Sequence, residues 1–188
     1  MIIRKTAAEL EKMRRSGLLV WQILQKLREM VREGVTTLDL ETAAERMMRD
    51  AGAKPAFKGY FAAAAGSKYP FVLCTSVNEE IVHGMPSAKR VLKPGDIVSI
   101  DTGVSLEGYY GDSAVTVAIG APDPKTERLL QVTSEALELA IDKVRPGNRC
   151  RTIAYAPGAD TTTATTAERQ AINRLFQREF MSHGSSRA

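Results

Sequence analysis

The chain has 188 residues, of which 44% are hydrophobic and 26% charged, which places it in the soluble globular class with enough residues for one sizeable core. Most of its net charge of +4 lies in residues 149–188, so the rest is nearly neutral and lacks the basic stripe of a nucleic-acid-binding face. No apolar run approaches the ~20 residues of a membrane helix, and no secretory signal is present. We therefore expect a cytoplasmic protein that spans no membrane.

The first fifty residues predict two helices. Thr6-Ala-Ala-Glu9 has the form of a capping box, and apolar residues then recur at helical spacing as far as Gly34. Thr37 is placed to cap a second helix, which runs to Asp50 and ends at Gly52.

Strands are predicted in the middle of the chain. Residues 69–78 are typical of a strand, and residues 79–86 of a second short strand and turn. A hairpin follows over residues 96–117, and residues 125–144 return to a helical stripe. This order predicts an α+β domain in which helices cover one face of an antiparallel sheet.

Asp101 and Asp112 lie in the two arms of the predicted hairpin. A turn with Gly108 at positive φ places the fold axis between Leu106 and Glu107, so that the two aspartates face each other, with Cβ atoms roughly 5 Å apart. Two carboxylates so placed repel unless a cation lies between them, which favours a site for one or two divalent ions. The alternative is that both line a solvated sheet face.

Three segments carry a resemblance to a known family. They are Cys74-Thr-Ser-Val-Asn-Glu-Glu-Ile-Val-His-Gly-Met-Pro86, Leu92-Lys-Pro-Gly-Asp-Ile-Val-Ser-Ile-Asp-Thr-Gly103 and Gly108-Tyr-Tyr-Gly-Asp-Ser113. In this order and spacing they resemble type I methionine aminopeptidases. The resemblance implies the pita-bread (creatinase/aminopeptidase-like) fold, with residues 1–148 as the N-terminal part of the catalytic domain and the second half of the fold incomplete.

The resemblance also implies a set of site residues. Asp101 and Asp112 match metal ligands for two divalent ions, which would be Co, Mn, Fe or Zn. His83 matches a histidine that contacts the substrate and takes part in catalysis, although a lone histidine is most often structural. Tyr69 and Cys74 correspond to the methionine pocket, with a role as plain core residues left open.

The implied activity is removal of the initiator methionine from nascent proteins by a metal-activated water. The implied partners are nascent polypeptide N-termini and the ribosome, with no specific nucleic acid and no membrane, and the enzyme is expected to be a monomer.

Residues 149–188 depart from the family pattern and form an atypical low-complexity and helical tail. Within it, Glu179-Phe-Met-Ser-His-Gly184 echoes the family's histidine segment and makes His183 a candidate metal ligand. We expect a truncated or frameshifted C-terminus, so the alternative function is an inactive fragment or binding module that lacks the later ligands. A related pita-bread hydrolase, such as a proline-specific aminopeptidase, is a third alternative.

Overall fold

The computed structural model describes residues 4–62 and 66–149. The chain divides into two compact units, one ending at Pro122 and one beginning at Asp123. Residues 150–188 of the predicted tail, which include His183, lie outside the described residues, and the proposed boundary after residue 148 stays a prediction. Among the helices described, none is long and apolar enough to cross a membrane.

Two helices open the first unit. Helix α1 spans Ala7–Met30, and the predicted capping box is confirmed, because Thr6 Oγ1 accepts from the Glu9 N–H while the Glu9 carboxylate accepts from the Thr6 N–H. Helix α2 spans Thr37–Asp50.

The predicted cap of α2 is wrong by one residue. Thr36 is the N-cap, since its hydroxyl accepts from the Asp39 N–H at 3.1 Å and the Asp39 carboxylate accepts from the Thr36 N–H at 2.8 Å. Thr37 is buried instead, and its hydroxyl accepts from the Ser87 N–H at 2.9 Å. Only Thr36 has an acidic residue three positions further on, which completes the reciprocal pair.

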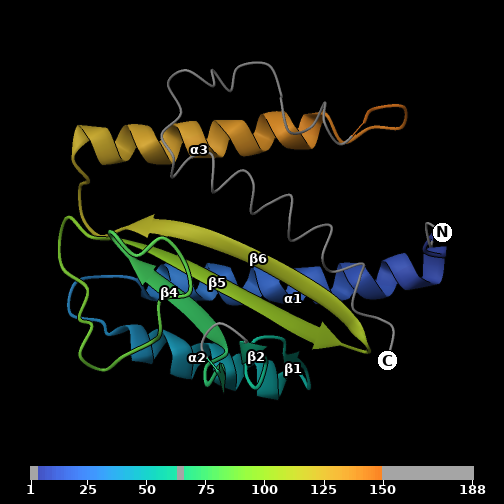
Figure 1. Cartoon of the computed structure of the whole chain (residues 1–188), viewed down its shortest axis with the longest axis horizontal. Helices are drawn as coiled ribbons and strands as arrows, with labels where there is room; N and C mark the ends of the chain where they lie inside the picture. Colours follow the sequence, from blue (N-terminus) through green and yellow to red (C-terminus); the bar gives the residue numbers. More distant parts are fainter. Residues whose placement is uncertain (1–3, 63–65, 150–188) are drawn as a thin grey trace. The chain divides into compact units, whose positions relative to one another are not determined.

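The sheet of the first unit is built around one central strand, β5 (Ile97–Leu106). Strand β6 (Tyr109–Ala118) pairs with it along one edge, while β4 (Leu73–Val77) and the short β1 (Lys54–Pro55) pair with it along the other (Figure 1). All of these pairings are antiparallel. Strands β2 (Phe61–Ala62) and β3 (Ser67–Lys68) form a separate small ladder.

Two strand predictions need correction. The strand predicted from Tyr69 begins at Leu73, and residues 79–86 are a loop and not a second strand. Strand β4 ends in a turn that is closed by two hydrogen bonds between Val77 and Glu80. The Glu80 carboxylate accepts from the Val77 N–H at 2.8 Å, and the Glu80 N–H donates to the Val77 carbonyl oxygen.

Both helices of the first unit cover the same face of the sheet, as predicted. On β5, Val98, Ile100 and Val104 point toward this face and are fully buried. They form one apolar cluster with the inward positions of α1 and α2. Its fully buried members include Ile23, Leu27, Leu40, Ala44, Val98, Ile100 and Val104.

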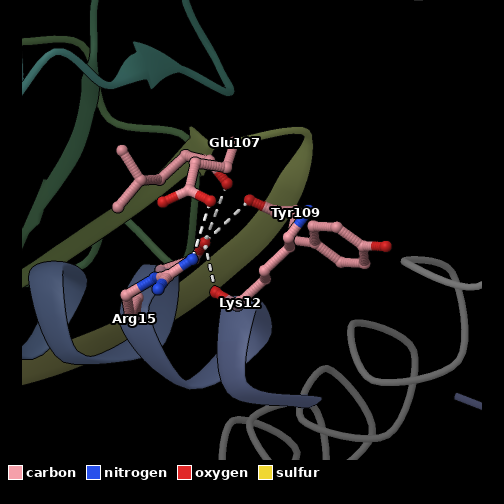
Figure 2. A network of polar contacts seen from close by, with 6 residues as sticks. Lys12, Arg15, Glu107 and Tyr109 are labelled. Atoms are coloured by element: carbon pink, nitrogen blue, oxygen red, sulfur yellow. Dashed lines mark hydrogen bonds and ion pairs between the residues drawn. The ribbon is translucent and has the colours of Figure 1, made fainter. Parts of the chain in front are cut away.

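The tip of the β5–β6 hairpin is fastened to α1 by polar contacts (Figure 2). The buried Ser16 hydroxyl lies 2.9 Å from the Tyr109 carbonyl oxygen and 3.4 Å from that of Leu106. Beside it, Arg15 forms an ion pair of 2.7 Å with Glu107, which is the first residue of the hairpin turn.

In the second unit, α3 spans Pro124–Asp142, close to the predicted range of 125–144. It begins earlier because the Asp123 carboxylate is the N-cap and accepts from the N–H groups of Lys125 and Thr126.

Candidate active site

The face of the sheet opposite the apolar cluster carries small and polar side chains. Strand alternation places every second residue of β4, β5 and β6 there, in rows that the register defines. In one row Cys74 pairs with Asp101, which pairs with Ala114. In the next row the hydroxyl oxygens of Ser99 and Thr116 lie 2.8 Å apart.

Asp101 and Asp112 share this face, but the prediction that they oppose each other directly is wrong. Asp101 pairs with Ala114, and Asp112 pairs with Gly103. The aspartates are therefore diagonal neighbours, a relation that corresponds to Cα atoms about 7–8 Å apart.

The hairpin turn explains this difference in register. Its two central residues are Glu107 and Gly108, with φ of 53° and 82°, as a type I′ turn requires. The fold axis thus lies between these two residues, one position later than predicted, and each cross-strand pair shifts by two residues.

Gly103 leaves room for the carboxylate of Asp112. A Cβ atom at position 103 would lie 3.2 Å from Asp112 Oδ2 and 3.1 Å from the Ala56 Cβ. Asp101, two residues earlier on the same strand and face, is buried, whereas Asp112 is exposed. Because Gly103 has no side chain, there is room beside the two carboxylates. One of these carboxylates is buried and the other is exposed to solvent.

These two carboxylates suit a divalent cation. Carboxylate oxygens are the donors that hard divalent ions prefer, and a cation offsets the repulsion between the two negative charges. Within residues 4–62 and 66–149, no group of three or more His, Cys, Asp or Glu side chains is placed to hold a metal ion. The described residues therefore bring together two carboxylates, without a third side chain of these types placed to join them around a metal ion.

Tyr69 and Cys74 lie at the same end of β4 as Asp101. The Tyr69 hydroxyl donates to the Leu73 carbonyl oxygen at 2.8 Å, and Cys74 is buried beside it. Burial raises the pKa of Tyr69 strongly, and the Cys74 side chain raises it further, as do the charges of Glu41 and Asp101. The phenol is thus neutral at physiological pH, and the structure brings Tyr69, Cys74 and Asp101 into one neighbourhood.

His83 is held near β4 by the glycine that follows it. The Gly84 carbonyl accepts from the Thr75 N–H at 2.8 Å, and its N–H donates to the Ser76 hydroxyl at 3.1 Å. A Cβ on Gly84 would lie 2.8 Å from the Ser76 Cα, so no side chain fits there. His83 itself is exposed and has φ of 59°, an uncommon conformation for a residue other than glycine.

Three polar residues that support this region were not singled out from the sequence. The buried Glu41 carboxylate accepts from the N–H groups of Val72 and Leu73 just before β4. Asn78 donates to the Asp96 carboxylate at 2.7 Å and joins the end of β4 to the start of β5. A signal for Glu41 was available, because it is an acidic residue next to the apolar stripe of α2.

Comparison with known proteins identifies the protein family to which the chain belongs. The family model described as "Metallopeptidase family M24" matches residues 11–184. The chain belongs to this family, whose description makes its members metal-dependent peptidases.

Relatives narrow the resemblance further. The chain is 45% identical to a methionine aminopeptidase of Aquifex aeolicus over 148 residues, which are 79% of this chain and 57% of the relative. It is 39% identical to methionine aminopeptidase 1 of Bacillus subtilis over 184 residues, which are 98% and 68% of the two chains. The chain thus spans about 57% to 68% of the length of these two relatives.

Solved structures confirm the pita-bread fold. The methionine aminopeptidase of Thermotoga maritima matches with a TM-score of 0.76 and 42% identity, over 83% of this chain and 60% of that one. The prolidase of Pyrococcus horikoshii matches with a TM-score of 0.67 and 20% identity, over 94% and 44%, which shows a shared fold alone.

Proposed function

We propose that this chain is a metal-dependent aminopeptidase that removes the initiator methionine from nascent proteins. The observation that supports it best is the pair Asp101 and Asp112, which share one sheet face beside the space kept by Gly103, in a member of a metallopeptidase family. Relatives named methionine aminopeptidase at 39% to 45% identity support the choice of substrate.

Asp101 and Asp112 are the proposed ligands of two divalent ions, which would be Co, Mn, Fe or Zn. His183 is a further proposed ligand, supported by the family match, which extends to residue 184. When bound, such ions supply Lewis acidity and a nucleophilic water near neutral pH.

The remaining roles belong to side chains in and beside β4. His83 is proposed to donate a hydrogen bond to the negative charge that develops on the substrate carbonyl oxygen. Tyr69 and Cys74 are proposed to contact the methionine side chain, since sulfur and aromatic groups suit a flexible thioether. The hydrogen bond from Tyr69 to the Leu73 carbonyl fixes the position of the ring.

The proposed partners are the N-termini of nascent polypeptides and the ribosome that carries them. The proposed setting is a monomer in the cytoplasm, without specific nucleic-acid or membrane binding.

Peptide hydrolysis tests this function. Purified protein with added Co(II) or Mn(II) should release methionine from a Met-Ala-Ser peptide, and Asp101→Asn should reduce the rate by more than the ~10–100-fold typical of outer-shell changes. Asp50→Asn, which alters an exposed carboxylate on α2, is the control and should keep the activity.

A folded protein that releases no methionine at any metal concentration would contradict the proposal. That result would favour the inactive fragment or binding module. Calorimetric titration adds a second readout, since binding of about two metal ions per chain is expected of the enzyme but not of a chain that lacks its later ligands.

A further inference from the structure

A small basic pocket lies where β4 ends and β5 begins. Its volume is about 290 Å³, and it is lined by Lys89, Arg90, Val91, Lys93 and Asp96. Apart from Asp96, whose hydrogen bond with Asn78 joins the end of β4 to the start of β5, none of these residues was placed in the candidate active site above. The pocket therefore needs its own explanation.

The pocket carries an excess of positive charge. Its single carboxylate, Asp96, accepts hydrogen bonds from the Asn78 amide at 2.7 Å and the Lys93 N–H at 3.0 Å. These bonds lower the pKa of Asp96, with the Asn78 bond as the larger cause. Across the described residues, neither the Lys89 nor the Lys93 ammonium group forms an ion pair.

The guanidinium of Arg90 is only partly satisfied. One terminal nitrogen, Nη2, donates to the Val77 carbonyl oxygen at 3.3 Å. Its Nε–H is buried and has no acceptor within the part of the chain that the structure describes. Because arginine keeps its charge and its guanidinium carries donors only, this group favours an anion with oxygen acceptors in the pocket.

The segment that presents these cations is anchored before any ligand arrives. The Arg90 carbonyl accepts from the Thr37 N–H at 3.1 Å, and the Leu92 N–H donates to the Val35 carbonyl at 2.9 Å. The Leu92 side chain is fully buried. A pocket held in this way loses little conformational freedom on binding, which favours affinity.

We propose that this pocket binds a single phosphate group, either inorganic phosphate or the phosphate of a small monoester. The guanidinium fork of Arg90 and two lysine ammonium groups are the donors that proteins use for phosphate oxygens. The volume lies just below the ~300–1,000 Å³ range of ligand pockets, which suits a small anion. This inference is independent of the proposed aminopeptidase activity.

Titration with inorganic phosphate tests the proposal, with ionic strength held constant by chloride and EDTA present to remove metal ions. The side-chain Nε–H signal of Arg90, followed by ¹H–¹⁵N NMR, should shift and saturate. The double variant Lys89→Gln/Lys93→Gln should bind at least about tenfold more weakly, because hydrogen bonds to charged groups are strong. Lys54→Gln/Lys125→Gln removes the same charge elsewhere and should bind as the wild type does.

A second variant, Arg90→Lys, keeps the charge but removes the guanidinium fork, and calorimetric titration with inorganic phosphate should show weaker binding than that of the wild type. Equal phosphate affinity in the wild type and both pocket variants would overturn the proposal, as would an Arg90 signal that does not move. Binding of single-stranded RNA without binding of inorganic phosphate would overturn it as well, because that result indicates a surface that needs several phosphodiesters.

Discussion

Glu41 is a carboxylate placed in the interior, and it fixes the start of β4. It is 4% exposed, and its two oxygens accept from the N–H groups of Val72 and Leu73 at 2.7 and 2.9 Å. Burial raises the pKa of Glu41, while these two hydrogen bonds act in the opposite direction. Because the folded pKa is raised, protonation favours the native state, and this contribution is lost as pH rises through the folded pKa.

Glu41→Gln should destabilise the protein at neutral pH. The amide keeps one acceptor oxygen, but its NH₂ group faces a backbone N–H, so a buried donor loses its acceptor at a cost of about 1–3 kcal/mol. Urea unfolding measures the loss. Glu45→Gln, on the same helix, removes an exposed ion pair with Lys58 and should cost at most about 1 kcal/mol. Equal losses in the two variants would contradict this role of Glu41.

Asp96 should make stability depend on pH in the acidic range. Its pKa is lowered from the ordinary value of 3.8, mainly by the hydrogen bond from Asn78, so its stabilising contribution is present above that value and is lost as pH falls through the folded pKa. Asp96→Asn should therefore be less stable than the wild type near neutral pH, and the difference should shrink as pH falls through the ordinary value of 3.8 and then through the folded pKa. Urea unfolding at several pH values measures the difference, and a constant gap would count against it.

At the scale of elements, α1 and β6 approach each other through small residues. A Cβ on Gly111 would lie 2.6 Å from the backbone carbonyl carbon of Ser16, and the Ser16 hydroxyl lies 2.9 Å from the Tyr109 carbonyl oxygen. A larger residue at either position would force the helix away from the strand. The position of the hairpin on the helix thus depends on one glycine and one serine.

Gly111→Ala should destabilise the protein by about 1–3 kcal/mol, because the added methyl group meets the backbone of α1, which cannot move without displacing the helix. Gly17→Ala is the matched control, since a Cβ there meets open space and alanine favours the helix by up to about 1 kcal/mol. Thermal unfolding should give opposite shifts for the two variants. A Gly111→Ala variant as stable as the wild type would show that α1 and β6 have room for a methyl group between them.

Elements that depend on local chemistry could be predicted from the sequence. The capping box at Thr6 and Glu9 was predicted because both partners lie within one helical turn. The hairpin was predicted, but its register was not, because a non-glycine residue, Glu107, adopts positive φ in the turn. No rule of composition favours that conformation at a glutamate, so the pairing moved by two residues.

In the candidate site too, features set by local sequence could be predicted, and features set by contacts between distant segments could not. The sequence placed Asp101 and Asp112 on one sheet face, which the structure confirms, because strand alternation survives a shift of two residues. The position of Gly84 on β4 depends on contacts between segments distant in the sequence, and these contacts leave no local pattern. The metal and substrate roles of the site residues stay predictions.

At the scale of the whole first unit, one strand organises both the fold and the candidate metal site. Strand β5 pairs with β1, β4 and β6 (Figure 1). It carries both Asp101 and Gly103. Asp112 reaches the same face only when β6 is paired in the observed register. An unfolded chain does not hold these carboxylates together, so the metal binding proposed for them is coupled to folding.

Metal addition should therefore raise the thermal stability of the chain. A ligand that binds only the native state stabilises it by about 2.7 kcal/mol at a concentration of 100 times its dissociation constant. Mn(II) should accordingly raise the melting temperature of the wild type and of Asp50→Asn, and EDTA should reverse the shift. Asp101→Asn should lose most of the shift, because the buried carboxylate is replaced by a neutral amide. A shift of equal size in the Asp101→Asn variant would place the stabilising metal elsewhere and would remove the main support for this pair of aspartates as ligands.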